Sequence, residues 1–197
     1  MLALHVFFRG QVQYSLTGAR LDRLIEDVLG TASRSDSFSG GAGSDISATF
    51  VLAAPHRNPA KVDREFDSYL QVMANLHKMY GALKWLLPVG SVVSAEEYLT
   101  NNIWLSDNPD PPAADPLIVA DMDSGQALDP RCALPISTVR MVVEEFCGLR
   151  TGRRPESIGW VPGEFSGRRL DGEQAITGPR YCEDPWCQVS DSRHDYH

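Results

Sequence analysis

The segment from Leu134 to Trp160 places the strongest constraint on how this chain can fold. Its apolar residues recur at intervals of three and four, then a basic Gly/Pro turn follows at Thr151–Pro155, and the segment ends at Trp160. This pattern predicts an amphipathic helix capped by Ser137, a turn, and a strand over residues 156–161. The segment holds no recognisable catalytic constellation, so it indicates a well-specified scaffold and favours a binding function.

The rest of the chain predicts further strands and helices around this unit. Alternating or continuous apolar runs predict strands over residues 2–8, 11–16, 46–54, 103–105 and 117–120. Helical spacing predicts helices over residues 17–29 and 61–86 and a single helical turn over residues 94–99. The expected fold class is therefore α+β, a mixed or antiparallel sheet flanked by about three helices.

Length and composition predict one domain and an ordinary core. A chain of 197 residues with 43% apolar residues can bury a core without disulfides or metal. We expect a single domain over residues 1–165 and a polar, weakly ordered tail over residues 166–197. No apolar run approaches the roughly 20 residues that span a bilayer, and the N-terminus lacks the features of a signal peptide. Four scattered cysteines fit a reducing setting, so we expect a cytoplasmic protein.

The net charge of −8 is concentrated in one part of the chain. Residues 1–84 have nine basic and eight acidic side chains, and residues 131–197 have nine and ten, so these two parts cancel. Residues 85–130 contain no Lys or Arg and eight acidic residues: Glu96, Glu97, Asp107, Asp110, Asp115, Asp121, Asp123 and Asp129. A field of one sign attracts a basic partner and repels nucleic acid and anionic membranes. The same charges are also typical of a solvated loop that keeps a protein soluble.

The acidic segment also contains an aromatic residue and several prolines. Trp104 comes just before the acidic residues, and Pro109, Pro111 and Pro112 stiffen the chain between them. An aromatic anchor surrounded by carboxylates is suited to docking on a basic cleft. The candidate partner-binding residues are Trp104, Asp107, Asp110, Asp115, Asp121 and Asp123. The alternative is that Trp104 is a core residue of a strand beside a solvated turn.

Few residues indicate catalysis or metal binding. The sequence has no phosphate-binding glycine loop, no nucleophile elbow and no zinc-deaminase pattern. One alternative is an enzyme that uses the carboxylates of Asp121, Asp123 or Glu164 in a cleft. Another is a zinc-stabilised interaction module built on four donors in the tail: Cys182, Cys187, His194 and His197. We expect no cofactor.

Several of these motifs together resemble a known family. They are the Leu134–Ile136 and Val142–Phe146 helix, the Thr151–Pro155 helix exit, Ile158–Trp160, and Trp104 followed by Ser106–Pro109. In these residues the chain resembles the actinobacterial branch of the first-numbered immunity protein family of bacterial polymorphic toxin systems. The resemblance covers residues 103–161 well and residues 1–30 loosely. It implies an α+β protein without catalytic residues that protects the producing cell by occluding a secreted toxin, often a nuclease or a nucleic-acid deaminase.

Overall fold

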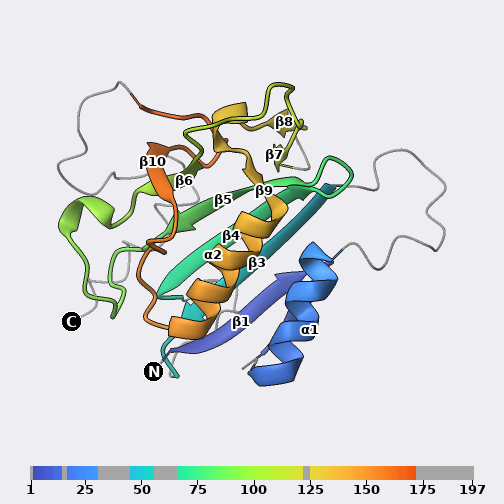
Figure 1. Cartoon of the computed structure of the whole chain (residues 1–197). Helices are drawn as coiled ribbons and strands as arrows, with labels where there is room; N and C mark the ends of the chain where they lie inside the picture. The colour runs from blue at the N-terminus through green and yellow to red at the C-terminus, as the bar shows by residue number, and fades with distance from the viewer. Residues whose placement is uncertain (1, 15–16, 31–44, 56–65, 122–124, 172–197) are drawn as a thin grey trace.

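The molecule is built on one antiparallel sheet with two helices on one of its faces (Figure 1). The computed structural model describes residues 2–14, 17–30, 45–55, 66–121 and 125–171. Seven strands follow the order β10-β6-β5-β4-β3-β1-β2, and an eighth short strand, β9, pairs with β5. These strands are β1 (Ala3–Phe8), β2 (Gln11–Gln13), β3 (Asp45–Ala53), β4 (Ser68–Asn75), β5 (Tyr80–Leu86), β6 (Ile103–Asp107), β9 (Leu134–Pro135) and β10 (Gly159–Gly163). A separate two-stranded ribbon pairs β7 (Val119–Asp121) with β8 (Gln126–Ala127).

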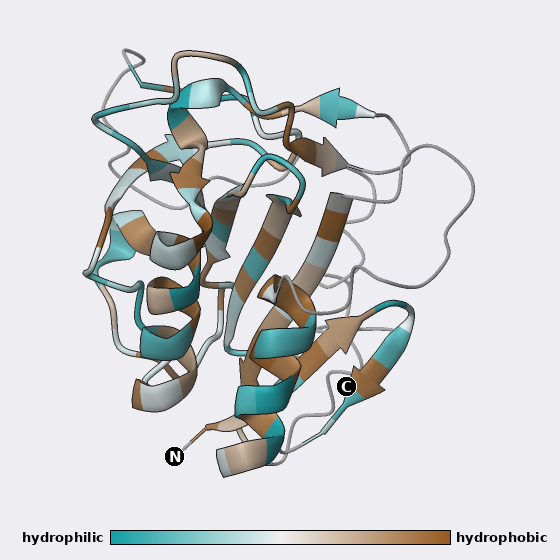
Figure 2. Ribbon diagram, turned by 45° about the vertical axis from the view of Figure 1, so that its right-hand side comes forward, coloured by the Kyte–Doolittle hydropathy of each residue, from teal (hydrophilic) through white to brown (hydrophobic). Residues whose placement is uncertain are grey.

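The two helices are α1 (Gly18–Leu29) and α2 (Ile136–Leu149), and they lie side by side on the same face of the sheet (Figure 2). Their buried faces carry the residues that the helical spacing indicated, such as Leu24 and Val28 on α1 and Val142 and Phe146 on α2. Arg140 of α2 reaches Glu26 of α1 at 2.8 Å between nitrogen and oxygen, so an ion pair also joins the helices. Neither helix is long and apolar enough to cross a membrane.

The α2 helix begins at Ile136 after Pro135, which occupies the capping position. The prediction that Ser137 caps this helix is therefore wrong by two residues, because proline fixes a φ that suits a helix entry. The helix ends at Leu149 and is capped by Arg150, whose φ of 48° is left-handed. Gly152 follows with a φ of 77°, and a Cβ there would lie 2.5 Å from Cγ2 of Val93. Both the conformation and the close approach require glycine at this point, where the chain turns back toward β10.

The strands β4 and β5 are largely buried on both faces of the sheet, which explains an incorrect prediction. Residues 66–86 do not form the expected helix; they contain β4 and β5, joined by a turn in which Nδ2 and Oδ1 of Asn75 both take part in hydrogen bonds. In β5 all residues after Tyr80 are buried, so the strand shows no alternation. The helical spacing of its apolar residues was fortuitous, and the described residues contain two α-helices instead of about three. The α+β class and the antiparallel sheet are confirmed.

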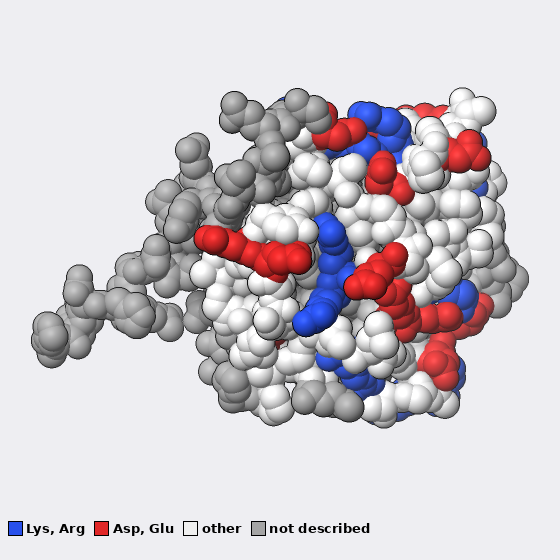
Figure 3. Space-filling view, turned by 60° about the vertical axis from the view of Figure 1, so that its left-hand side comes forward, with Lys and Arg blue, Asp and Glu red and all other residues white. Residues whose placement is uncertain are grey.

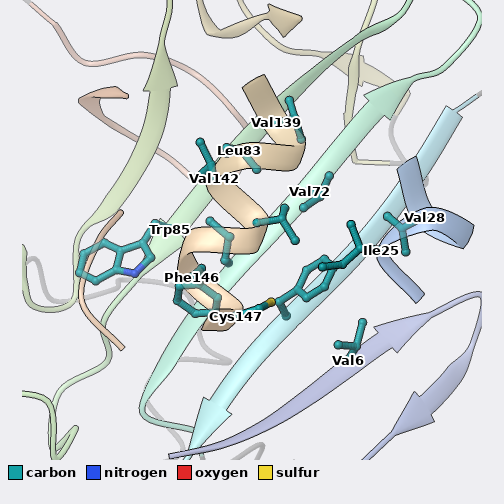
Figure 4. Packing of buried hydrophobic residues seen from close by; sticks show 14 of the residues in the cluster. Val6, Ile25, Val28, Val72, Leu83, Trp85, Val139, Val142, Phe146 and Cys147 are labelled. Atoms are coloured by element: carbon teal, nitrogen blue, oxygen red, sulfur yellow. The ribbon is translucent and has the colours of Figure 1, made fainter. Parts of the chain in front are cut away.

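One face of the sheet forms the larger core under α1 and α2 (Figure 4). Val72, Leu83 and Trp85 project from β4 and β5 toward Val142 and Phe146 of α2. The opposite face forms a smaller core with the chain that follows β6, including Ile118, Leu128 and Cys132. The acidic segment, residues 85–130, therefore begins in β5 inside the sheet. After β6 it crosses the face of the sheet that lies opposite the helices.

Candidate functional site

The connection between β6 and β7, residues 108–118, holds the candidate carboxylates that are exposed among the described side chains. Its first residue, Asn108, donates from its backbone N to the carbonyl O of Arg131 at 2.8 Å and from Nδ2 to that of Ala133 at 2.5 Å. At the other end, the carbonyl O of Pro116 accepts a hydrogen bond of 3.0 Å from Nδ2 of Asn75. The connection is thus fixed to the body of the protein at both ends. We call residues 108–118 the acidic loop.

Asp110 and Asp115 are exposed on the acidic loop. Asp115 accepts the backbone N–H of Leu117 at 2.7 Å, which is a local turn contact. Neither carboxylate forms an ion pair with any residue in the described part of the chain. Within the described residues, no cation neutralises either charge.

Asp107 and Asp129 are in a different situation, because arginines from later in the chain neutralise them. Nη2 of Arg169 lies 2.7 Å from Oδ1 of Asp107 and 3.0 Å from Oδ2 of Asp171, and the Arg169 side chain is only 5% exposed. Arg131 contacts both Asp129, at 2.8 Å, and Asp171, at 3.0 Å. Hydrogen bonding to Arg131 lowers the pKa of Asp129, and hydrogen bonding to Arg169 lowers that of Asp171. This network holds residues 169–171 against the sheet, and Leu170 beside it is buried.

Trp104 lies in the core, since only 7% of its surface is exposed and it packs in the larger core. The guanidinium carbon of Arg154 lies 4.4 Å from the centroid of its ring, and Tyr98 meets the ring edge-on at 5.9 Å. The exposed apolar residue of the acidic loop is instead Leu117, which is 58% exposed with a φ of 53°. Sequence reasoning missed Leu117; its position directly after Asp115 and Pro116 was the available signal.

The remaining candidates are only partly described. Asp121 is the last residue of β7 and pairs with Gln126 through the backbone, whereas Asp123 lies outside the described residues. Glu164 forms an ion pair with Arg168 at 2.7 Å. Cys182, Cys187, His194 and His197 also lie outside the described residues. Within the described ranges there is no cluster of three potential metal ligands.

A cleft of about 720 Å³ lies on the side of the molecule shown in Figure 3. One wall follows residues 94–99, which include the short 3-10 helix η1 (Glu97–Leu99), and the other follows residues 153–160. Trp85 lies at its base, and Arg154 lines it together with Glu96 and Glu156. Trp160, whose Nε1 donates to the carbonyl O of Pro155 at 2.8 Å, completes the second wall. Figure 3 shows basic side chains in the middle of this face with acidic side chains on both sides of them.

The family model described as Immunity protein Imm1 matches residues 17–162, more than two thirds of the chain. The chain belongs to the Imm1 family. Neither the comparison with curated proteins nor the comparison with solved structures gave a match.

The Imm1 match confirms the resemblance drawn from the motifs and extends it. It includes residues 31–102, for which the motifs offered no correspondence, and so it contains β3, β4 and β5 as well as η1. Both the acidic loop and the cleft fall within the matched residues. As a member of Imm1, the protein is an immunity protein, and its partner is a toxin.

Proposed function

We propose that this Imm1 protein neutralises a toxin that acts on nucleic acid, a nuclease or a nucleic-acid deaminase, by covering the toxin's basic active site with its acidic loop. The observation that carries the proposal is that Asp110 and Asp115 are exposed, without a cationic partner among the described residues, on a loop fixed at both ends. An enzyme that binds a phosphate backbone presents Lys and Arg around its active site. Carboxylates on a prefixed loop attract such a surface and lose little conformational entropy on binding it.

Leu117 supplies the apolar contact in this proposal. It is the exposed large apolar side chain next to Asp115 and lies at the end of the fixed loop. Trp104 supports this loop indirectly, because it anchors β6, the strand from which the loop leaves, in the larger core. Asp121 and Asp123 remain sequence candidates for the same surface, and Asp107 lies at the start of the loop beside Arg169.

The protein acts, in this proposal, by binding alone. It needs no cofactor, works in the cytoplasm of the cell that produces the toxin, and binds neither nucleic acid nor membrane. The concentration of all the net charge of −8 in residues 85–130 supports this selectivity, since nucleic acid and anionic lipid are repelled by the same field that attracts the toxin.

Association kinetics test the acidic loop directly. The double substitution Asp110→Asn and Asp115→Asn should slow association with the toxin encoded beside this protein by about tenfold at low salt, and should weaken the dependence of the rate on salt. Leu117→Ser should instead speed dissociation, because an apolar contact acts mainly after encounter.

The matched control is Asp22→Asn with Asp27→Asn on the exposed side of α1. It makes the same change in net charge, from −8 to −6, on an element away from the acidic loop (Figure 1). The control should associate within about twofold of the unmodified protein. Equal slowing in both variants would show that only net charge matters, and unchanged kinetics in the loop variant would place the interface elsewhere.

A further inference from the structure

The cleft beside η1 is lined by Arg154, a half-buried cation that forms no ion pair with the described residues. Nη1 of Arg154 is buried and makes no hydrogen bond within the described part of the chain, and no carboxylate there lies within ion-pair distance of this side chain. The guanidinium rests on the indole of Trp104, which fixes it in place. Burial lowers the pKa of Arg154, so the charged form is less well stabilised here than in water.

Buried arginines in stable folds are normally paired with carboxylates, as Arg169 is with Asp107 and Asp171 in this protein. Arg154 stands out by comparison. It lines an open cleft of about 720 Å³, which can admit one or more side chains of another protein. An incoming carboxylate would find a planar, preoriented guanidinium there and could bind it through two oxygens.

The surroundings of Arg154 define the partner further. Glu96 and Glu156 line the same cleft as Arg154. The complementary surface is therefore a carboxylate flanked by Lys or Arg. Apolar contact comes from Leu99, Ile158 and Trp160, which are each partly buried in the cleft walls. Enzymes that act on nucleic acid combine catalytic carboxylates with basic phosphate-binding residues in this way.

We propose that the cleft is a second docking element for the toxin, in which Arg154 binds an Asp or Glu side chain of a toxin segment that also carries Lys or Arg. This inference rests on the proposed function and names a contact that the acidic loop does not supply. The acidic loop attracts the toxin's basic surface, and the cleft sets the register by accepting one of its carboxylates.

The test fills the cleft without disturbing the core. Ala95 is exposed on the cleft wall, so Ala95→Trp adds bulk where the toxin segment would enter. It should weaken binding of the toxin encoded beside this protein by at least about thirtyfold. Ala19→Trp, at an exposed position on α1, is the matched control and should bind within about twofold.

Two substitutions of Arg154 test the chemistry. Arg154→Gln should weaken binding by at least about thirtyfold. The affinity of Arg154→Lys should lie between that of Arg154→Gln and that of the unmodified protein, because lysine keeps the charge but loses the planar fork. Thermal unfolding of each variant checks that it is folded. Tight binding by the unmodified protein and equally tight binding by Ala95→Trp and Arg154→Gln would overturn the cleft proposal alone. Absence of binding by the unmodified protein would overturn the proposed function and this inference together.

Discussion

Arg154 lies over the indole ring of Trp104, with 4.4 Å between the guanidinium carbon and the ring centroid. This contact joins the loop that follows α2 to the strand from which the acidic loop leaves. It places a cation at the cleft wall and covers one face of the Trp104 ring, which is 7% exposed. The acidic loop and the cleft are therefore both supported by the contact between Arg154 and Trp104.

A double-mutant cycle measures this support. Trp104→Leu and Arg154→Met should each lower the free energy of unfolding, and their coupling energy should be about 0.5–1 kcal/mol, because each substitution removes one partner of the cation–π contact. Urea unfolding of the two single variants and the double variant gives the coupling. Additive effects would mean that the contact contributes nothing beyond the packing of each side chain.

Asp67 is a second structural support, which joins the chain at Ala54 to that at Val92. Its side chain is completely buried and accepts the backbone N–H of Ala54 at 2.6 Å and that of Val92 at 2.9 Å. Asp67→Ala leaves these amides without their acceptor and should cost about 3 kcal/mol of stability. Asp22→Ala, at an exposed position, should change stability by less than about 0.5 kcal/mol. A similar small effect at both positions would contradict this role for Asp67.

The network around Arg169 predicts a dependence of stability on acid. The pKa values of Asp129 and Asp171 are lowered in the folded protein by Arg131 and Arg169 respectively. The unfolded chain therefore binds protons first, at about pH 4, and the stabilisation present above that pH is lost as the pH falls through the lowered values. Urea unfolding at a series of pH values should show this loss below about pH 5.

Arg169→Gln separates this network from general acid effects. The variant should lose about 1–3 kcal/mol at neutral pH and should show a shallower decline in acid, because Asp171 loses one of its two cationic partners. Arg140→Gln, which removes an exposed ion pair with Glu26, should lose less than about 1 kcal/mol and keep the full acid dependence. An unchanged slope in Arg169→Gln would assign the acid sensitivity to other groups.

The two described cysteines should react slowly. Burial raises the pKa of Cys132 to about 11 and that of Cys147 to about 12, so almost no thiolate is present near neutral pH. Alkylation by iodoacetamide at about pH 8, followed by mass spectrometry of the peptides that contain each residue, should be more than about a hundredfold slower in the native protein than in denaturant. Rapid native labelling of Cys147 would contradict its position on the buried face of α2.

The elements that are buried on one face only were predicted best, because their apolar residues recur with a single period along the sequence. In α2 only one face is covered, so Val139, Val142, Val143 and Phe146 displayed a clean helical spacing. The hairpin of β4 and β5 is covered on both faces, and its apolar residues fitted a helix equally well. The turn at Asn75–Met79, which contains neither Gly nor Pro, gave no signal to divide the segment into two strands.

For the candidate site, composition predicted the acidic loop but could not identify which charges are free. Pro109, Pro111 and Pro112 indicated an exposed connection, and the structure places Asp110 and Asp115 on it. The pairing of Asp107 with Arg169 joins residues separated by 62 positions, so no local pattern reveals it. The cleft is likewise formed by residues 94–99 and 153–160, which only the pairing of β6 with β10 brings together.

The central claim is that this Imm1 protein inhibits its toxin by direct contact through the acidic loop. The most direct measurement titrates the purified protein against the nuclease or deaminase activity of the toxin encoded beside it. The account predicts complete inhibition at one equivalent, and a large excess needed for the Asp110→Asn, Asp115→Asn, Leu117→Ser variant. Undiminished toxin activity at a large excess of the unmodified protein would contradict it.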